Sequence, residues 1–223
     1  MYLDDILIFS KNAAEHEQHL AEVLDILEKN KFYAKLAKCD LNRTELLYLG
    51  HIVGAYGIKV DPAKIAAVAS WPVPADVPQV RSFLGLTNYF RKFIQGYAER
   101  CKPLTNLTRK HTPFDWTSEC QASFDGLKQD LTSAPVLSAP DFTKAFEVVA
   151  DASEWSIGAV LLQDGRPLAF ESRKMIPAEL NYTVSEKECL ATVHAMKVWR
   201  CYLEGISKDK PTLVTDHNPN VHL

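Results

Sequence analysis

The chain has 223 residues, which is long enough for one large domain or two small ones. Its 47% hydrophobic and 24% charged residues are typical of a folded globular protein, which excludes a disordered or collagen-like chain. The formal net charge of −3 gives no global sign of nucleic-acid binding, which normally shows as a basic surplus.

The cysteines argue against a disulfide framework, because their number is odd and none forms a Cys-x-x-Cys pair. They are Cys39, Cys101, Cys120, Cys189 and Cys201. No secretory segment is evident either, so we expect reduced thiols in an intracellular protein of the cytoplasm or nucleus, not a secreted one. No apolar run approaches the ~18 residues needed to cross a bilayer, so we expect no membrane role.

The first 60 residues predict a strand, a helix and a hairpin. Ile6–Phe9 is a β-type run that follows two adjacent aspartates, as a strand follows a tight turn. Apolar residues recurring at i, i+3, i+4 and i+7 predict a helix at about 13–30. Two β segments, 46–53 and 58–60, flank Gly54–Gly57, whose glycines can supply the positive φ of a hairpin turn.

The middle of the chain is predicted to be helical. Asp61 and Pro62 are typical of an N-cap and a first helical residue, and an aromatic-rich amphipathic helix is expected over Val80–Ile94. A third helix is expected at about 117–131, and the prolines of Ser133–Pro140 then indicate a linker. The aromatic residues recur at helical spacing, which favours a core over a base-stacking surface. They are Phe83, Tyr89, Phe90, Phe93 and Tyr97.

Charge is distributed unevenly along this helical region. Between Asp76 and Lys110 there are seven basic and two acidic residues, 7 − 2 = +5, which leaves −3 − 5 = −8 for the rest. The basic residues are Arg81, Arg91, Lys92, Arg100, Lys102, Arg109 and Lys110. A solvated helix face and a surface for backbone phosphates both account for such a stretch from charge alone.

The last third of the chain predicts a mixed sheet. Three β segments, 146–150, 157–162 and 168–170, are spaced as an antiparallel meander with a turn at Asp164 and Gly165. A long helix at about 177–204 and a short strand at 212–215 complete the chain. Strands followed by a helix and a further strand indicate a mixed α/β fold.

One pair of acidic residues fits the demands of phosphoryl transfer. Two divalent ions about 3.5–4 Å apart need converging oxygen ligands, and Asp4 and Asp5 stand at the mouth of the first predicted strand. Aspartate is also common in ordinary turns, so the pair alone favours a turn. The surrounding residues, however, resemble a known family.

Tyr2–Ser10 resembles the catalytic Tyr-x-Asp-Asp motif of reverse transcriptases, in the form found in gypsy-type LTR retrotransposons. Further along, Tyr48–Val53 resembles the primer-grip hairpin and Arg81–Ile94 resembles the thumb. Pro103–Thr105 and Phe114–Thr117 continue the series in the expected order. The resemblance therefore covers nearly the whole chain.

The later acidic residues resemble the RNase H domain of the same elements. Carried over from that motif, Asp151, Glu188 and Asp216 are metal ligands, separated by 188 − 151 = 37 and 216 − 188 = 28 positions. The implied ion is Mg²⁺, with Mn²⁺ as the alternative. Glu186 lies two residues from Glu188 on the same helix and points about 200° away, so only one of them can face the site, and the motif favours Glu188.

The resemblance implies an α/β (α+β) fold in four parts. These are the end of a polymerase palm at 1–60, with an active-site strand, a helix and a primer-grip-like hairpin; a thumb-like helical subdomain at 61–110; a connecting helix and linker at 111–141; and a C-terminally truncated RNase H-like domain at 142–223. The implied activities are RNA-directed DNA polymerisation and hydrolysis of the RNA strand of a hybrid, both by two-metal phosphoryl transfer.

The implied partners are an RNA–DNA hybrid or a primer–template, and dNTP in the full-length parent. The residues expected to contact nucleic acid are Tyr48, Leu49, Gly50, His51, Arg81, Arg91, Lys92, Arg100 and Lys102, with Tyr2 and His217 in accessory positions. Ordinary polar strand-end residues are the alternative for His51 and His217, and for His217 the motif match favours a location at the site. We expect the fingers, an earlier palm aspartate and a fourth RNase H carboxylate to lie outside this chain, so the alternative is an inactive remnant that only binds nucleic acid.

Overall fold

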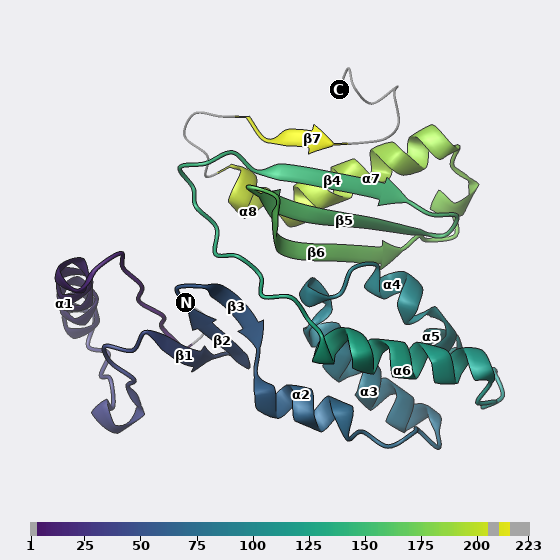
Figure 1. Cartoon of the computed structure of the whole chain (residues 1–223), viewed down its shortest axis with the longest axis horizontal. Coiled ribbons are helices and arrows are strands. Elements are labelled where there is room, and N and C mark those ends of the chain that lie inside the picture. Colours follow the sequence, from purple (N-terminus) through teal and green to yellow (C-terminus); the bar gives the residue numbers. More distant parts are fainter. Residues whose placement is uncertain (1–3, 205–209, 215–223) are drawn as a thin grey trace.

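A computed structural model describes residues 4–204 and 210–214 of the chain. Figure 1 shows a small sheet near the N-terminus, a group of helices, and a larger sheet with a long helix packed along it. This arrangement confirms the predicted mixed α/β class. Within the described residues, no helix is long and apolar enough to cross a membrane, and all five cysteines are free thiols.

The N-terminal segment contains the predicted helix but lacks the predicted strand. Helix α1 spans Ala13–Lys29 and is capped by Asn12, whose side chain accepts a hydrogen bond from the backbone N–H of Glu15. The strand expected at Ile6–Phe9 is wrong, because residues 6–10 form no strand and Phe9 is 83% exposed. A strand needs a partner for its backbone N–H and C=O groups, and the described residues supply no ladder there.

A three-stranded antiparallel sheet follows, made of β1 (Glu45–Tyr48), β2 (His51–Gly54) and β3 (Gly57–Val60). The single β segment expected at 46–53 is wrong. It is interrupted by a two-residue turn at Leu49 and Gly50, whose φ angles of 48° and 69° have the signs of a type I′ hairpin turn. The second turn lies at 54–57 as predicted, where Gly54 pairs with Gly57.

The helices form one hydrophobic core. They are α2 (Pro62–Ala69), α3 (Val77–Tyr89), the 3₁₀ turn η2 (Arg91–Phe93), α4 (Tyr97–Arg100), α5 (Lys102–Leu107) and α6 (Ser118–Thr132). Asp61, Asp76 and Thr117 cap α2, α3 and α6 with their side-chain oxygens. The helix expected over Val80–Ile94 begins earlier because Asp76 caps it, and it ends at Tyr89.

The aromatic residues of this region were predicted to be core, and four of the five are buried: Phe83, Phe90, Phe93 and Tyr97. Tyr89 is the exception, because it is 53% exposed and its hydroxyl donates to the Leu49 carbonyl over 2.7 Å. The same core includes Phe124 of α6 and Leu137 of the predicted linker. The structure therefore joins residues of the 61–110 and 111–141 segments in one hydrophobic cluster.

The larger sheet has the strand order β6-β5-β4-β7. Its strands are β4 (Glu147–Ala152), β5 (Ser156–Gln163), β6 (Arg166–Lys174) and β7 (Thr212–Val214). The first three form an antiparallel meander, with the predicted turn at Asp164 and Gly165, and β7 pairs with β4 in parallel. Because β4 and β7 are parallel, their carboxyl ends lie at the same edge.

The helix expected over 177–204 is divided into three parts. These are the 3₁₀ turn η3 (Glu179–Asn181), α7 (Val184–Val198) and α8 (Arg200–Leu203). A reciprocal capping box between Thr183 and Glu186 fixes the start of α7, and Tyr182 before it is extended. Helix α7 packs on one face of the sheet through Ala191 and Ala195.

The helical core meets the larger sheet along its edge strand β6 (Figure 1). Phe170 of β6 packs against the helical core, and the backbone N–H of Ala98 donates to Ser172 Oγ over 2.9 Å. The Glu99 carboxylate accepts hydrogen bonds from the hydroxyls of Ser153 and Ser156. These contacts position the β4–β5 turn, which follows Asp151, relative to the helices.

Candidate functional site

The carboxylates of Asp151 and Glu188 lie at one end of the larger sheet. Asp151 is exposed near the end of β4, whereas Glu188, in α7, is only 6% exposed. Glu188 Oε1 accepts a hydrogen bond from the backbone N–H of Ala152 over 3.3 Å. The structure thus brings the Glu188 side chain to the residue that follows Asp151, although Asp151 and Glu188 are 37 residues apart in the sequence.

Glu186 has a different role from Glu188. Its Oε2 accepts hydrogen bonds from the Thr183 backbone N–H over 2.8 Å and from the Thr183 hydroxyl over 2.9 Å. The backbone bond first and the hydroxyl bond second lower the pKa of the Glu186 carboxyl. The Thr-x-x-Glu spacing that signals such a cap is visible in the sequence.

Strand register places Asp151 on the open face of the sheet. Asp151 pairs with Gly158 on β5, and Gly158 pairs with Ser172 on β6, so these three residues share a face. The neighbouring residues Ala150 and Ala152 belong to the cluster that packs on α7. The Asp151 side chain therefore points away from α7, and a glycine beside it leaves that face unobstructed.

The third predicted ligand, Asp216, lies outside the described residues, as do His217 and Tyr2. Within the part of the chain that is described, no group of three His, Cys, Asp or Glu side chains is placed to hold a metal ion. Asp4 and Asp5 are both exposed, and the Tyr48 hydroxyl donates to the Asp5 carbonyl over 3.2 Å. The polymerase-type pair is thus present without a third described ligand.

The predicted primer-grip hairpin is fixed to the helical core. The Leu49 carbonyl accepts hydrogen bonds from the Tyr89 hydroxyl and, over 2.6 Å, from His51 Nδ1. The His51 ring is buried and lies parallel to the Phe93 ring with centroids 5.6 Å apart. A carbonyl can only accept, so Nδ1 carries the proton, and the buried Nε2 has no hydrogen-bond partner among the described atoms. His51 is therefore a neutral core residue in this structure.

The burial of His51 makes stability depend on pH. Burial first and the nearby Lys92 ammonium second lower its pKa below the ordinary 6.5. The unfolded chain therefore binds a proton below about pH 6.5 that the folded chain does not, and the free energy of unfolding falls by up to about 1.4 kcal/mol per pH unit until the folded-state pKa is reached.

His51→Phe should remove this pH dependence, because phenylalanine keeps the ring packing without a titratable group. Urea unfolding of both proteins at pH 7.5 and pH 5.0 measures it, and the difference in stability between the two pH values should be smaller for the variant. Equal differences for the two proteins would contradict the assignment of a buried neutral histidine.

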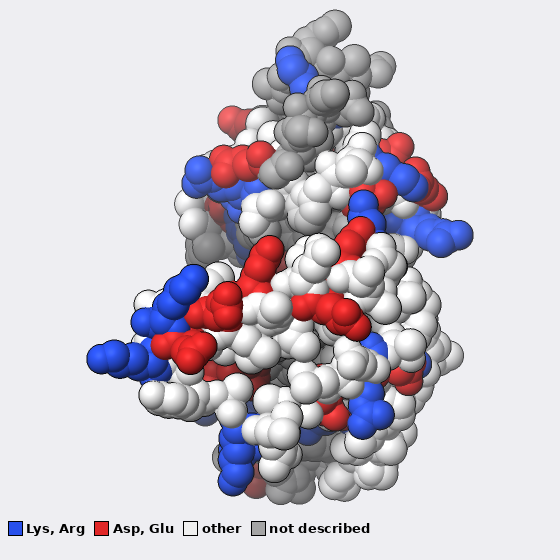
Figure 2. Space-filling view, turned by 90° about the vertical axis from the view of Figure 1, so that its left-hand side faces the viewer, with Lys and Arg blue, Asp and Glu red and all other residues white. Residues whose placement is uncertain are grey.

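Most of the predicted basic contact residues have partners within the chain. Arg81 donates to the Thr108 carbonyl, Arg100 pairs with Asp130 at 3.0 Å, and Arg91 lies 3.5 Å from Glu171. Lys92 is half-buried, and burial lowers its pKa. Figure 2 shows blue and red side chains interspersed on the face it presents, so no uniformly basic surface exists there.

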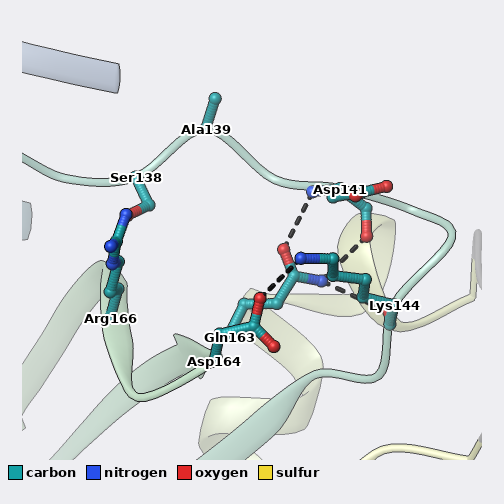
Figure 3. Close-up of a pocket in the computed structure, with 7 residues that line it drawn as sticks. All are labelled: Ser138, Ala139, Asp141, Lys144, Gln163, Asp164 and Arg166. Carbon is teal, nitrogen blue, oxygen red and sulfur yellow. Dashed lines mark hydrogen bonds and ion pairs between the residues drawn. The ribbon is translucent and has the colours of Figure 1, made fainter. Parts of the chain in front are cut away.

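A cavity of about 390 Å³ lies where the linker passes the β5–β6 turn (Figure 3). Its central residue is Gln163, whose amide accepts from the Asp141 N–H and donates to the Asp141 carbonyl, each over 2.8 Å. Lys144 and Asp164 also line the cavity and form an ion pair of 2.6 Å. None of the predicted site residues lines this cavity, and its bonded groups anchor the linker to the sheet.

Two family models match the chain. The one described as "Reverse transcriptase (RNA-dependent DNA polymerase)" matches residues 1–53, and the one described as "RNase H-like domain found in reverse transcriptase" matches residues 116–211. The chain is 42% identical over 220 residues to the Retrovirus-related Pol polyprotein from transposon 297 of Drosophila melanogaster, a match that covers 98% of this chain and 20% of that protein. The chain belongs to the reverse transcriptase and RNase H family of retrotransposon Pol polyproteins.

A relative from fission yeast supports the same family. The chain is 38% identical over 221 residues to the Transposon Tf2-3 polyprotein of Schizosaccharomyces pombe, covering 97% of this chain and 16% of that Ty3/gypsy-type Pol relative. The predicted resemblance to gypsy-type elements is therefore confirmed. This segment spans a fifth or less of the length of these curated relatives.

Solved reverse transcriptase structures share the fold of this Pol segment. The foamy viral protease-reverse transcriptase in complex with an RNA/DNA hybrid covers 94% of the chain with a TM-score of 0.77 and 23% identity, and the match spans 29% of that protein. The same viral protein in complex with double-stranded DNA gives a TM-score of 0.69, 23% identity, and coverage of 94% of this chain and 53% of that one. At these identities the likeness shows the fold alone.

Proposed function

We propose that this Pol segment hydrolyses the RNA strand of an RNA–DNA hybrid by two-metal phosphoryl transfer, with Asp151, Glu188 and Asp216 as the metal ligands. The observation that carries the proposal is the approach of Glu188 to the end of β4, where its carboxylate accepts from Ala152 N–H over 3.3 Å. The Glu188 carboxylate is buried and the Asp151 side chain is exposed, and the two residues approach the same end of β4 from opposite faces of the sheet.

The parallel pairing of β4 and β7 supports the inclusion of Asp216. Val149 pairs with Val214, and Asp151 and Asp216 each follow their member of that pair by two residues. The carboxyl ends of parallel strands meet at one edge, so a third carboxylate is expected beside the first two. Three carboxylates suit the oxygen-ligand preference of Mg²⁺, and Mn²⁺ is the alternative ion.

The residues of this chain have separable roles in the proposed reaction. Bound Mg²⁺ would supply charge stabilisation for the scissile phosphate and a more acidic water. Asp151 would present its exposed oxygens on the open face, and the Ala152 N–H would orient Glu188. The RNA strand would be distinguished by its 2′-hydroxyl groups, which a DNA strand lacks.

In the full-length parent we propose RNA-directed DNA polymerisation on a primer–template with dNTP, with Asp4 and Asp5 as ligands. Their motif, which lies within the family match to residues 1–53, supports this part of the proposal. The contrasting hypothesis is an inactive remnant that only binds nucleic acid. It predicts salt-sensitive binding of a hybrid without cleavage of its RNA strand.

Cleavage of a hybrid labelled on its RNA strand tests the proposal. The 223-residue chain should cut the RNA strand with Mg²⁺ or Mn²⁺ and leave it intact with EDTA, and Asp151→Asn should abolish cleavage while retaining hybrid binding. Binding without cleavage in any metal would favour the inactive remnant. An equal rate for Asp151→Asn and the original chain would refute the site assignment.

A further inference from the structure

A cleft of about 250 Å³ lies between helices α3–α5 and the end of β6, beside the turn that joins β4 to β5. Its lining includes four basic residues and no acidic one: Arg91, Lys102, Arg173 and Lys174. Trp155, from the β4–β5 turn, forms part of one wall. We propose that this cleft binds backbone phosphates of the nucleic-acid duplex beside Asp151, an inference that rests on the proposed function.

Two of the four cations are already engaged. Arg173 forms a two-pronged pair with Glu179, at 2.7 and 2.9 Å, and Arg91 lies 3.5 Å from Glu171. Neither glutamate lines the cleft, so each one holds its arginine from outside the cleft. Arg173 also donates to His194 Nδ1 and to the Lys174 carbonyl, so the two arginines shape the cleft more than they attract an anion.

The two lysines are the cations available to a ligand. Lys174 is exposed, and within the described residues neither lysine has a carboxylate within ion-pairing distance. The Lys102 ammonium lies 3.7 Å from the centroid of the Trp155 ring, which holds a cation without neutralising it. A lysine fixed by an aromatic face can contact a phosphate with little further loss of side-chain freedom.

The register places this cleft on the same face of the sheet as Asp151. Ser172, which lines the cleft, shares a rung with Gly158 and Asp151, and Lys174 lies two residues further along β6 on the same face. Two strand spacings of about 4.8 Å separate Ser172 from Asp151, roughly 10 Å. At a rise of about 3.4 Å per nucleotide, that corresponds to close to three nucleotides along the duplex axis.

The walls of the cleft are held together by hydrogen bonds across the junction. Ser172 Oγ accepts from Ala98 N–H, and Glu99 accepts from Ser153 and Ser156 in the β4–β5 turn. The helical side and the sheet side of the cleft are therefore positioned before a ligand arrives. A phosphate seated there would set which nucleotide reaches Asp151.

Equilibrium binding of a fluorescent RNA–DNA hybrid in EDTA, measured at several salt concentrations, tests the inference without relying on cleavage. Lys102→Gln with Lys174→Gln removes both free cations of the cleft. Arg109→Gln with Lys110→Gln is the matched control, because it removes the same charge from two exposed residues outside the lining. The slope of log affinity against log salt should become shallower by about 2 for the cleft variant and stay unchanged for the control.

The outcomes separate this inference from the proposed function. A chain that binds and cleaves the hybrid, with equal slopes for both double variants, would overturn the cleft and leave the RNase H proposal standing. A chain that does not bind the hybrid would overturn both. If thermal melting shows that the variant with Lys102→Gln and Lys174→Gln is unfolded, the salt dependence of binding is measured for the single variant Lys174→Gln instead. The Lys174 side chain is exposed, so its replacement should leave the fold intact. The slope of log affinity against log salt should become shallower by about 1 for this single variant, and an unchanged slope would refute phosphate binding in the cleft.

Discussion

Replacing Glu188 with glutamine is expected to reduce hybrid cleavage by about a thousandfold without weakening hybrid binding in EDTA. The amide keeps the size of the side chain and can still accept from Ala152 N–H, but it loses the negative charge that a metal ligand supplies. Several kcal/mol of charge stabilisation are lost with a metal, and about 1.4 kcal/mol corresponds to each tenfold change in rate. Single-turnover cleavage with saturating chain measures this change.

Glu186→Gln is the matched control, because it makes the same change two residues earlier on α7. Its carboxylate accepts both of its hydrogen bonds from Thr183 at the helix N-terminus, so cleavage should persist and the melting temperature should fall slightly. A loss of cleavage in Glu186→Gln with full activity in Glu188→Gln would show that the other face of the helix carries the ligand.

Gly57→Ala is expected to destabilise the chain by about 3–5 kcal/mol, combining backbone strain with lost hydrogen bonds. Gly57 has a φ of 122°, and an added Cβ would lie 2.0 Å from the carbonyl oxygen of Leu137. That oxygen accepts from Ile58 N–H over 2.7 Å, and Leu137 N–H donates back over 2.9 Å. The variant must therefore separate the linker from the β2–β3 hairpin, which urea unfolding will detect.

Gly126→Ala provides the contrasting control. Gly126 lies inside α6, where an added Cβ meets nothing within 4 Å, so alanine should stabilise the chain by up to about 1 kcal/mol through helix propensity. If both glycine variants shift stability by the same amount and in the same direction, the close approach at Leu137 is not what requires Gly57.

Local signals in the sequence predicted the starts of α2 and α6 but not those of α3 and α7. Asp61 with Pro62, and Thr117, cap helices where their side chains predicted, because a cap depends only on its neighbours. The strand predicted at Ile6–Phe9 did not form. A strand needs a neighbouring strand for its backbone hydrogen bonds, and the residue pattern of one segment does not show whether that neighbour is present. The turn at Leu49 was missed because leucine is an unusual residue for positive φ.

Asp151 and Glu188 were selected by their resemblance to the RNase H motif, and the fold brings the Glu188 side chain to the residue that follows Asp151. The count of charges between residues 76 and 110 did not show which basic side chains are free to contact nucleic acid. The carboxylates opposite Arg91 and Arg100 are Glu171 and Asp130, which lie beyond that window and become neighbours only in the folded chain.

The parallel pairing of β4 with β7 also constrains when the proposed nuclease site can form during synthesis. The paired residues Val149 and Val214 are separated by the whole of β5, β6 and α7, so this contact closes only after those elements have been synthesised. A ribosome-bound chain that ends before β7 would already hold Asp151 and Glu188 but would lack the parallel strand. The proposed nuclease site would therefore require that β7 has been synthesised and has paired with β4.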